Sequence, residues 1–256
     1  MEWRDEAIVL SARLHGETSA ILEVLSPSHG RHLGLVHGGA SRKARSLLQP
    51  GNLIAAHWRA RLSEHLGSFT AEPVKLVTHQ LLDDRVRLMG MQAAAAALSA
   101  TLAEREPHEP VYHALKALID AAEGMDGLDW AAAYVVFELG LLAELGFGLD
   151  LKRCAVTGST DDLSHVSPRS GRAVSRAAAA PYEGKLLALP SFLLGRQAGH
   201  PSGQDVLDGL RLTAHFIEKY VLSPHFKPLP EARHQFTDIV RTEAERSPGE
   251  SGSETP

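Results

Sequence analysis

The sequence predicts an α+β protein in which a small β-barrel comes first and a helical domain follows. The first 78 residues have the short alternating segments of strands, whereas the spacing of apolar residues becomes helical from about residue 79. The composition, 44% hydrophobic and 22% charged over 256 residues, is that of a globular protein with a substantial core. We therefore expect a barrel domain over residues 1–79, a helical domain over residues 80–242 and a polar, disordered tail over residues 243–256.

Five segments of the N-terminal region have the β-rich, alternating pattern of strands. They span residues 7–14, 19–25, 31–37, 52–62 and 68–77. Hairpin-forming residues separate the first two strands at His15-Gly-Glu-Thr18, and Ser26-Pro-Ser-His-Gly30 ends the second strand. Because the longest connection lies between the third and fourth strands, the pattern predicts a five-stranded OB-fold β-barrel. An SH3-like barrel fits the strand count nearly as well.

Four later segments have the apolar spacing of helices. They span residues 89–102, 111–122, 129–145 and 205–222. Asp129 stands directly before an apolar run, so we expect it to cap the third helix. Residues 150–185 are rich in Gly, Ser and Pro, which predicts irregular structure. The apolar run over residues 130–149 is long enough to span a bilayer, but its Glu138 and Glu144 indicate a buried helix instead.

The cysteine content and the first residues indicate a cytoplasmic protein. The chain has one cysteine, Cys154, which excludes an internal disulfide and is typical of a reducing compartment. The opening residues, Met1-Glu-Trp-Arg-Asp-Glu6, have mixed charge and no apolar run, so we expect no signal peptide and no membrane association.

No motif of the sequence predicts an enzyme active site. Gly184-Lys185 lacks the glycine spacing and the following Ser or Thr of a phosphate-binding loop. Gly38-Gly39 lacks the third glycine of a dinucleotide fingerprint, and Cys154 has no evident base. His32 and His37 point to opposite sides of one predicted strand, which argues against a metal site there.

The net charge of −5 conceals a basic region in the predicted barrel. No acidic residue occurs between Glu23 and Glu64, so we expect that the cations of this window do not form salt bridges within the chain. The cations of the window are Arg31, Arg42, Lys43, Arg45, Arg59 and Arg61. Arg59 and Arg61 face opposite to Trp58 on their strand, because side chains alternate with a period of two residues.

The centre of this window is His37-Gly-Gly-Ala-Ser-Arg-Lys-Ala-Arg-Ser-Leu-Leu-Gln-Pro-Gly51. We expect a loop whose cations meet the phosphates of a polyanion, while Leu47-Leu48 and Pro50-Gly51 hold it against the barrel. An ordinary solvated loop can carry the same charges. The lack of carboxylates and the position on a small barrel nevertheless favour non-specific nucleic-acid binding. Trp58 and Phe69 are the only nearby aromatic residues that could stack on bases, and Trp58 fits the core of the barrel equally well.

Two stretches resemble sequence motifs of the RecO family of bacterial recombination mediators. In residues 36–51 the resemblance lies in the Gly-Gly pair, the spaced cations and the Leu-Gln-Pro-Gly exit. In the second stretch it lies in Glu144-Leu-Gly-Phe-Gly-Leu-Asp-Leu-Lys-Arg-Cys-Ala-Val-Thr-Gly158, followed by His165-Val-Ser-Pro-Arg-Ser-Gly171. Each motif alone is moderately specific. Together they extend the resemblance over essentially the whole ordered chain.

The resemblance implies an N-terminal OB-fold joined to an α-helical domain, and a DNA repair function without catalysis. It implies binding of single- and double-stranded DNA, ATP-independent annealing of complementary strands, and help in loading RecA during gap repair. It also implies work with RecR, in some members with RecF, and contact with the acidic C-terminal tail of single-stranded DNA-binding protein. By similarity, Arg42, Lys43 and Arg45 are the first candidates for DNA contacts. Arg31, Arg59 and Arg61 rest on local charge alone.

The sequence departs from the family in the segment after the long apolar helix. Many RecO-like proteins hold a structural zinc there with two Cys-x-x-Cys pairs. Here the first pair reads Cys154-Ala-Val-Thr157, and residues 173–179 contain no cysteine, which leaves Cys154 and His165. Because a structural zinc needs four such ligands, we expect no zinc and no other cofactor. We expect a degenerate zinc-knuckle-like turn around residues 150–185, with Gly158 retained.

Two alternative functions are compatible with the sequence. In the first, the chain is an interaction adaptor whose helical domain binds an acidic peptide and whose barrel is a scaffold. Its binding site would combine cations and apolar neighbours of the C-terminal region, which are Arg211, Lys219, Arg233, Leu212, Phe216 and Tyr220. In the second, the barrel binds RNA, since charge does not distinguish the two polymers.

Overall fold

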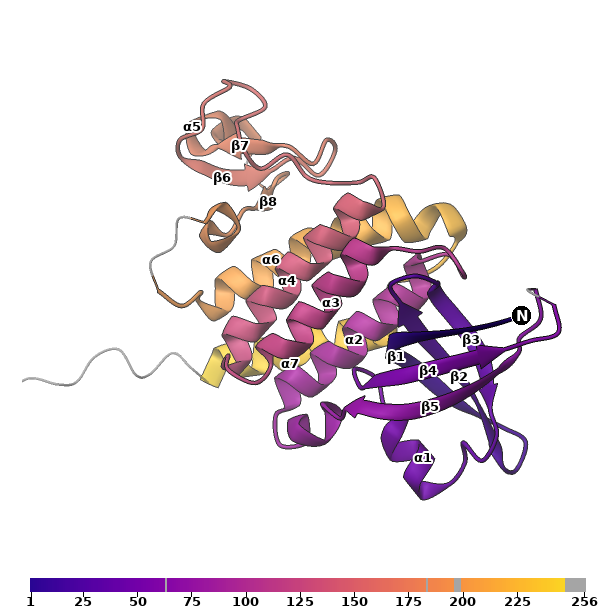
Figure 1. Ribbon diagram of the computed structural model, residues 1–256. Coiled ribbons are helices and arrows are strands. Elements are labelled where there is room, and N and C mark those ends of the chain that lie inside the picture. Colours follow the sequence, from indigo (N-terminus) through magenta and orange to yellow (C-terminus); the bar gives the residue numbers. More distant parts are fainter. Residues whose placement is uncertain (63, 183, 196–198, 247–256) are drawn as a thin grey trace, which may run out of the picture. The chain divides into compact units, whose positions relative to one another are not determined.

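The computed structural model describes residues 1–62, 64–182, 184–195 and 199–246 (Figure 1). The chain divides into two compact units, Met1–Glu123 and Gly124–Pro256. The first unit combines the strands of the N-terminal region with two helices. The second is mainly helical and includes a small sheet.

Five strands form the N-terminal region, as the alternating pattern predicts. They are β1 (Glu2–His15), β2 (Ser19–Ser26), β3 (Gly30–Val36), β4 (Leu53–Arg59) and β5 (Ser68–Lys75). They close into a barrel in the order β1-β2-β3-β5-β4. All neighbouring strands are antiparallel except β3 and β5, which pair in parallel at Leu35 and Ser68. The longest connection between consecutive strands of the barrel joins β3 to β4.

The interior of the barrel contains the two aromatic residues that the sequence offered as base-stacking candidates. Trp58 and Phe69 are only 3% and 4% exposed, so both belong to the core and neither is available to stack on bases. The Trp58 indole N–H donates to the carbonyl of Leu66 at 3.0 Å, which satisfies its polar edge. A Cβ at Gly34 would lie 2.5 Å from Cδ2 of Phe69, so a glycine is needed on β3 to admit the ring.

Two helices complete the first unit. They are α2 (Arg85–Thr101), capped by Asp84, and α3 (Glu109–Ala121). Polar contacts join them to the strands: the Ser99 hydroxyl donates to Glu23 at 2.9 Å, and the Tyr112 hydroxyl donates to Glu6 at 2.7 Å. Burial is the main cause that raises the pKa of Tyr112 above its usual value, and the Glu6 carboxylate adds to it. Strands and helices therefore share one packed unit.

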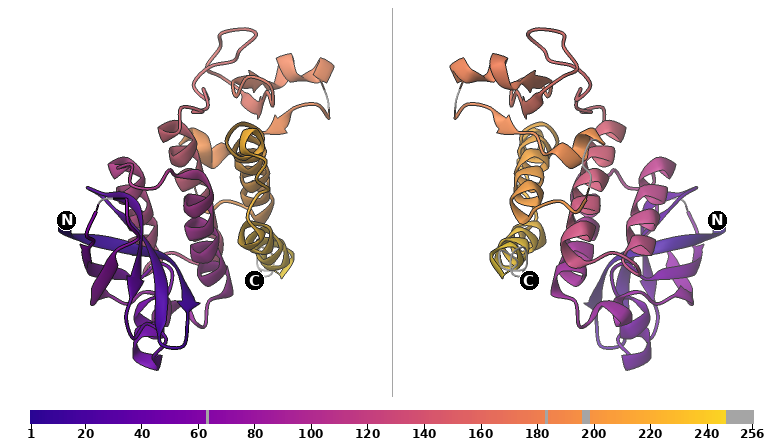
Figure 2. Two further views of the ribbon diagram at one scale, coloured as in Figure 1. Left: turned by 90° about the vertical axis from the view of Figure 1, so that its right-hand side faces the viewer. Right: turned by 90° about the vertical axis from the view of Figure 1, so that its left-hand side faces the viewer.

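The second unit is built on three long helices. They are α4 (Gly127–Glu144), α6 (Gly203–Phe216) and α7 (Glu231–Arg246), and α6 packs against both others (Figure 2). The expectation that Asp129 caps α4 is wrong, because Asp126 accepts the backbone N–H of Asp129 at 2.8 Å. A single turn of π-helix, Ile217–Leu222, continues α6. None of the described helices combines the length and hydropathy that a bilayer crossing requires.

Helix α7 has no counterpart among the predicted helices. It extends through residues 243–246, so the expectation of disorder is wrong for these four residues of the tail. Residues 247–256 lie outside the described part of the chain. The helix is mostly polar, and the side chains that it buries are Arg233, Phe236 and Val240.

Residues 150–185 are not wholly irregular. With Leu187–Ala188 (β8), they form a small antiparallel sheet of β6 (Leu163–Val166) and β7 (Ala173–Ser175), in the order β7-β6-β8. A four-residue helix, α5 (Arg176–Ala179), follows β7. These strands have two to four residues, too few to establish an alternating pattern in the sequence.

Candidate nucleic-acid interface

The basic stretch between β3 and β4 contains a helix where the sequence predicted a loop. Helix α1 spans Arg42–Leu47, and Figure 1 shows it at one end of the barrel. It begins at Ser41, whose hydroxyl accepts the backbone N–H of Ala44 at 3.3 Å. It ends at Leu48, which is 2% exposed and belongs to the barrel core. The chain then returns through Gly51 at φ +88°, a conformation that favours glycine.

The anchoring of this stretch agrees with the expectation from sequence. The backbone N–H of Gly51 donates to the carbonyl of Val9 at 2.9 Å, and Leu48 packs into the barrel. The side-chain amide of Asn52 donates to the carbonyls of Ser46 and Leu47, both at 3.0 Å. These contacts fix α1 on the barrel, so its cations project from a rigid element.

Arg42, Lys43 and Arg45 are exposed on α1. None of the three has a carboxylate within ion-pairing distance among the residues that the structure describes. Arg45 is fixed through its backbone, because its carbonyl accepts the side-chain amide of Gln49 at 2.8 Å. The three predicted contact residues therefore share one short helix and are free to meet an external anion.

Two other cations of the basic window are engaged within the chain. The Arg31 guanidinium lies 2.5 Å from the Glu23 carboxylate and donates to the carbonyl of Leu102 at 2.9 Å. Arg59 lies 2.8 Å from Glu2, its cross-strand neighbour on β1. The expectation that the cations of this window form no internal salt bridges is therefore wrong for this pair of residues. Arg61 is exposed beyond the end of β4.

Two grooves adjoin α1. The larger, of about 890 Å³, has Arg42 and Lys43 on its rim and runs between α1, the end of β3 and β5. Its apolar lining is Val36, Ala44, Leu47, Leu48, Phe69, Ala71, Pro73 and Leu76. The smaller, of about 260 Å³, is lined by Arg45 of α1 and Arg13 of β1. Sequence reasoning missed Arg13, because it precedes Glu17 and Glu23 and so lies outside the acid-free window.

Neither groove beside α1 has a carboxylate among its described lining residues. Grooves elsewhere differ. Asp5 and Glu72 line a groove over β1, β4 and β5, and four acidic side chains line a groove between α6 and α7. The surface around α1 therefore combines hollows and unpaired positive charge with no carboxylate among the described lining residues.

The alternative acidic-peptide site does not form as the sequence suggested. Arg233 is 1% exposed, and its guanidinium lies 2.7 Å from the Glu138 carboxylate, so it cannot receive a peptide. Leu212 and Phe216 are also buried. Lys219 is exposed, but its ammonium group donates to the carbonyl of Pro168 at 2.9 Å. Of the six residues, the exposed Arg211 and Lys219 and the half-buried Tyr220 remain at the surface, and the Tyr220 hydroxyl donates to Arg169.

The thiol of Cys154 is held by hydrogen bonds. Its Sγ accepts the backbone N–H of Ser175 at 3.3 Å, the Ser175 hydroxyl at 3.4 Å and the Thr157 N–H at 3.5 Å. Burial acts to raise the pKa of this thiol, but the hydrogen bonds outweigh burial and lower the pKa to about 6. Gly158, at φ +74°, closes the turn by donating to the Cys154 carbonyl.

The donors around Cys154 do not fit a structural zinc. Such a site needs four Cys or His ligands, whereas Ser175 and Thr157 present hydroxyl and amide groups to the sulfur. Within the described residues, the one group of three potential metal ligands lies elsewhere, at Asp126, Asp129 and His200. Hydrogen bonds from Ser175 and Thr157 thus hold the sulfur in this turn.

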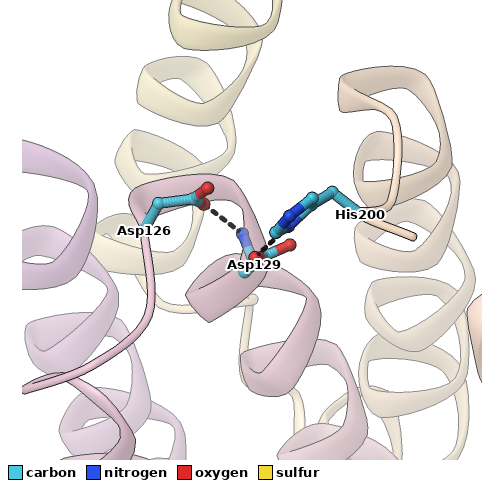
Figure 3. A group of neighbouring side chains, drawn as sticks. All are labelled: Asp126, Asp129 and His200. Atoms are coloured by element: carbon cyan, nitrogen blue, oxygen red, sulfur yellow. Dashed lines mark hydrogen bonds and ion pairs between the residues drawn. The ribbon is translucent and has the colours of Figure 1, made fainter.

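The cluster of Asp126, Asp129 and His200 has a structural explanation (Figure 3). Asp126 caps α4, and the Asp129 carboxylate lies 2.5 Å from Nδ1 of His200. This contact raises the pKa of His200. A cation bound here would face the positive end of the α4 dipole, which disfavours it. The three side chains therefore act as a helix cap and an ion pair.

Comparison with known proteins shows which family this chain resembles. Residues 1–77 match the family model described as recombination protein O N terminal, and residues 82–230 match recombination protein O C terminal. A protein of Rhodospirillum rubrum named DNA repair protein RecO is 51% identical over 244 residues, covering 94% of this chain and 97% of the relative. A protein of the same name from Phenylobacterium zucineum is 53% identical over 233 residues, covering 91% and 95%.

A third relative, from Methylobacterium nodulans, is 49% identical over 248 residues and is matched along 100% of its length. It is also named DNA repair protein RecO. The two family models follow one another in the order of the strand region and the helices, and the identity extends through both compact units. The chain therefore belongs to the RecO family of DNA repair proteins.

Proposed function

We propose that the chain binds single- and double-stranded DNA, anneals complementary strands without ATP and helps to load recombinase in gap repair. The observation that carries this proposal is the carboxylate-free surface around α1, with three exposed cations and two grooves. The barrel order β1-β2-β3-β5-β4, with β3 parallel to β5, supports assigning the N-terminal region to the OB-fold.

Arg42, Lys43 and Arg45 are the proposed primary DNA contacts. Each unpaired cation beside a phosphate releases condensed counterions, which gives affinity without sequence preference. Arg61 is a secondary candidate because it is exposed. Arg31 and Arg59 become weaker candidates, since a phosphate would have to compete with the carboxylates that already bind them.

The proposed annealing mechanism is electrostatic. Two DNA strands repel each other through their phosphates, and a cationic surface that binds both lowers that repulsion. Base pairing then selects the product, so the protein needs no nucleotide hydrolysis and no catalytic residue. The scarcity of exposed aromatic residues in the described grooves is consistent with holding strands by their backbones and leaving bases free to pair.

Membership of the family also supports a cytoplasmic location and a set of partners. The proposed partners are RecR and the acidic C-terminal tail of single-stranded DNA-binding protein, together with RecF, which only some members use. The adaptor alternative loses support, because Arg233, Leu212 and Phe216 are buried. RNA binding remains a distinct outcome of the experiment below, since phosphate contacts are common to both polymers.

The decisive experiment measures how salt weakens binding of a fluorescent single-stranded oligonucleotide. In the triple variant Arg42→Gln, Lys43→Gln and Arg45→Gln, the slope of log K against log salt should fall by about 2 units, at roughly 0.7 per phosphate contact. Duplex formation from complementary strands should slow in the same variant. Competition with duplex DNA and RNA at two salt concentrations reports the preferred polymer.

The matched control removes three cations from the second unit. Lys152, Arg153 and Arg241 are exposed there, so their replacement by Gln changes the net charge equally. The control should keep the slope of the parent protein. An unchanged slope in the α1 variant would refute the assignment of DNA contacts to α1.

A further inference from the structure

Helix α1 distributes its three cations between two hollows. Arg42 and Lys43 line the larger groove and Arg45 lines the smaller one. Lys43 and Arg45 lie about 200° apart around a helix with 3.6 residues per turn, whereas Arg42 and Arg45 lie about 60° apart. The assignment of the cations to two grooves therefore rests on the residues that line each groove. Leu48 lies in the walls of both grooves and is buried, so the end of α1 forms a fixed partition between them.

The smaller groove gains its second cation from a different element. Arg13 is exposed on β1, and Arg45 joins it across the groove from α1. The other described lining residues are neutral, so the two guanidinium groups meet no competing carboxylate there. Two guanidinium groups on a shallow hollow of about 260 Å³ suit a phosphate group, because the hollow is below the usual size of a ligand pocket.

The larger groove differs in volume and in chemistry. Its volume of about 890 Å³ is within the range of pockets that enclose an organic ligand. Arg42 and Lys43 lie at its rim, while Leu47, Pro73 and the partly exposed Leu76 supply apolar surface. A nucleotide has the same division, with an anionic backbone and an apolar base face. Charge and apolar surface together therefore suit an unpaired strand in this groove.

We propose that α1 separates two DNA paths: an unpaired strand lies in the larger groove on Arg42 and Lys43, and a second strand places its phosphate on Arg13 and Arg45. This inference rests on the proposed function and adds how the two strands are kept apart until they pair. The partition holds the strands on opposite sides of one short helix. Each strand is then neutralised by its own pair of cations.

Two double variants of the full chain separate the paths. Arg42→Gln with Lys43→Gln should lower the salt slope for a single-stranded thymidine oligonucleotide by about 1.4 units, at roughly 0.7 per contact. Arg13→Gln with Arg45→Gln should lower that slope by only about 0.7 units, the contribution of Arg45, because Arg13 meets only the second strand. It should nevertheless slow annealing of two complementary oligonucleotides about tenfold, because the second strand loses two phosphate contacts. All four side chains are exposed, and thermal melts should confirm that both variants remain folded.

The outcomes distinguish this inference from the proposed function. Parent protein that neither binds nor anneals oligonucleotides would refute the proposed function. Parent protein that anneals, with both double variants lowering the single-strand slope equally, would refute two paths in favour of one strand wrapped around α1. An acidic peptide with apolar side chains can also serve as a competitor. If this peptide displaces the oligonucleotide by binding Arg42 and Lys43 but does not affect annealing, the assignment of DNA to the larger groove is refuted.

Discussion

At the scale of single residues, Arg233 of the second unit is a buried side chain held by several hydrogen bonds. Its Nε and Nη2 donate to the two oxygens of Glu138 at 2.7 and 2.9 Å, and its Nη1 donates to Thr237 at 2.6 Å. Glu138 also accepts the hydroxyl of Tyr134 at 3.0 Å and that of Thr213. Burial is the largest influence on the Arg233 pKa and acts to lower it, but the Glu138 carboxylate prevails and raises the pKa above its usual value.

Arg233→Met should destabilise the protein by about 3–5 kcal/mol, because Glu138 would keep its charge without its partner in a buried site. Adding Glu138→Gln to that variant should recover much of the loss, since the amide is neutral: its oxygen still accepts one of the Tyr134 and Thr213 hydroxyls, and its NH2 group can donate to the oxygen of the other. Urea denaturation measures both changes. The control is Arg241→Met, which breaks an exposed pair with Asp238 and should cost less than about 1 kcal/mol. Equal losses for Arg233 and Arg241 would contradict the importance of burial.

Salt bridges between strands explain why the sequence did not reveal the partners of Arg31 and Arg59. The window from Glu23 to Glu64 lacks carboxylates in sequence, but strand pairing brings in others from outside it. Glu2 is opposite Arg59 in the register of β1 and β4, and Glu23 is on β2 beside Arg31 on β3. Charge spacing along one strand cannot reveal a partner on its neighbour, because cross-strand contacts depend on register.

At the scale of elements, the cap of α1 should affect the DNA contacts that we propose for this helix. Ser41→Ala removes the hydroxyl that accepts the Ala44 N–H, and losing such a cap costs about 1 kcal/mol. In a helix of six residues that loss should fray the first turn and weaken single-strand binding about fivefold, with all three cations still present. Fluorescence anisotropy measures the affinity. Ser41→Thr retains a capping hydroxyl and should bind like the parent; equal affinity of the alanine variant would show that helical geometry is unimportant.

The elements that the sequence predicted well are those with a clear period. Strand β3 alternates between buried and half-buried positions, and helix α3 carries its buried residues at helical spacing. Strand β2 and helix α4 are mostly apolar instead, because many of their positions are buried. Helix α7 was missed because only three of its 16 residues are buried, and one of these three is Arg233. Helix α1 was missed because it has six residues and no buried residue of its own. Short elements supported by tertiary contacts leave little periodic signal.

At the scale of the whole molecule, strands and helices of the first unit depend on each other. The sequence places a boundary near residue 79, where strand spacing gives way to helical spacing. Several contacts cross that point: Ser99 with Glu23, Tyr112 with Glu6, and Lys75 with Asp120 at 2.9 Å. The backbone of Arg105 also donates to the carbonyl of Arg31 at 2.7 Å. By its contacts, the compact unit continues to Glu123.

We therefore expect a fragment of residues 1–123 to unfold cooperatively and a fragment of residues 1–79 to be poorly folded. The shorter fragment would expose the apolar surface that β1 and β2 present to α2 and α3. It would also leave Glu23 without Ser99 and Glu6 without Tyr112. Thermal unfolding followed by circular dichroism compares the fragments. A sharp transition of equal midpoint in both would place the domain boundary at residue 79 instead.

The ion pairs of Arg31 with Glu23 and of Arg59 with Glu2 also bear on how long a bound strand stays. Two cations of this surface form salt bridges within the chain, so fewer remain to contact phosphates. Because related complexes differ mainly in their dissociation rates, fewer contacts would shorten the time that a strand stays bound. Brief residence lets a strand be tried against many partners in succession. A surface with every cation free would retain mismatched strands for longer. Under the annealing function that we propose, the two internal pairs would thus favour release of wrong pairings over tenacious binding.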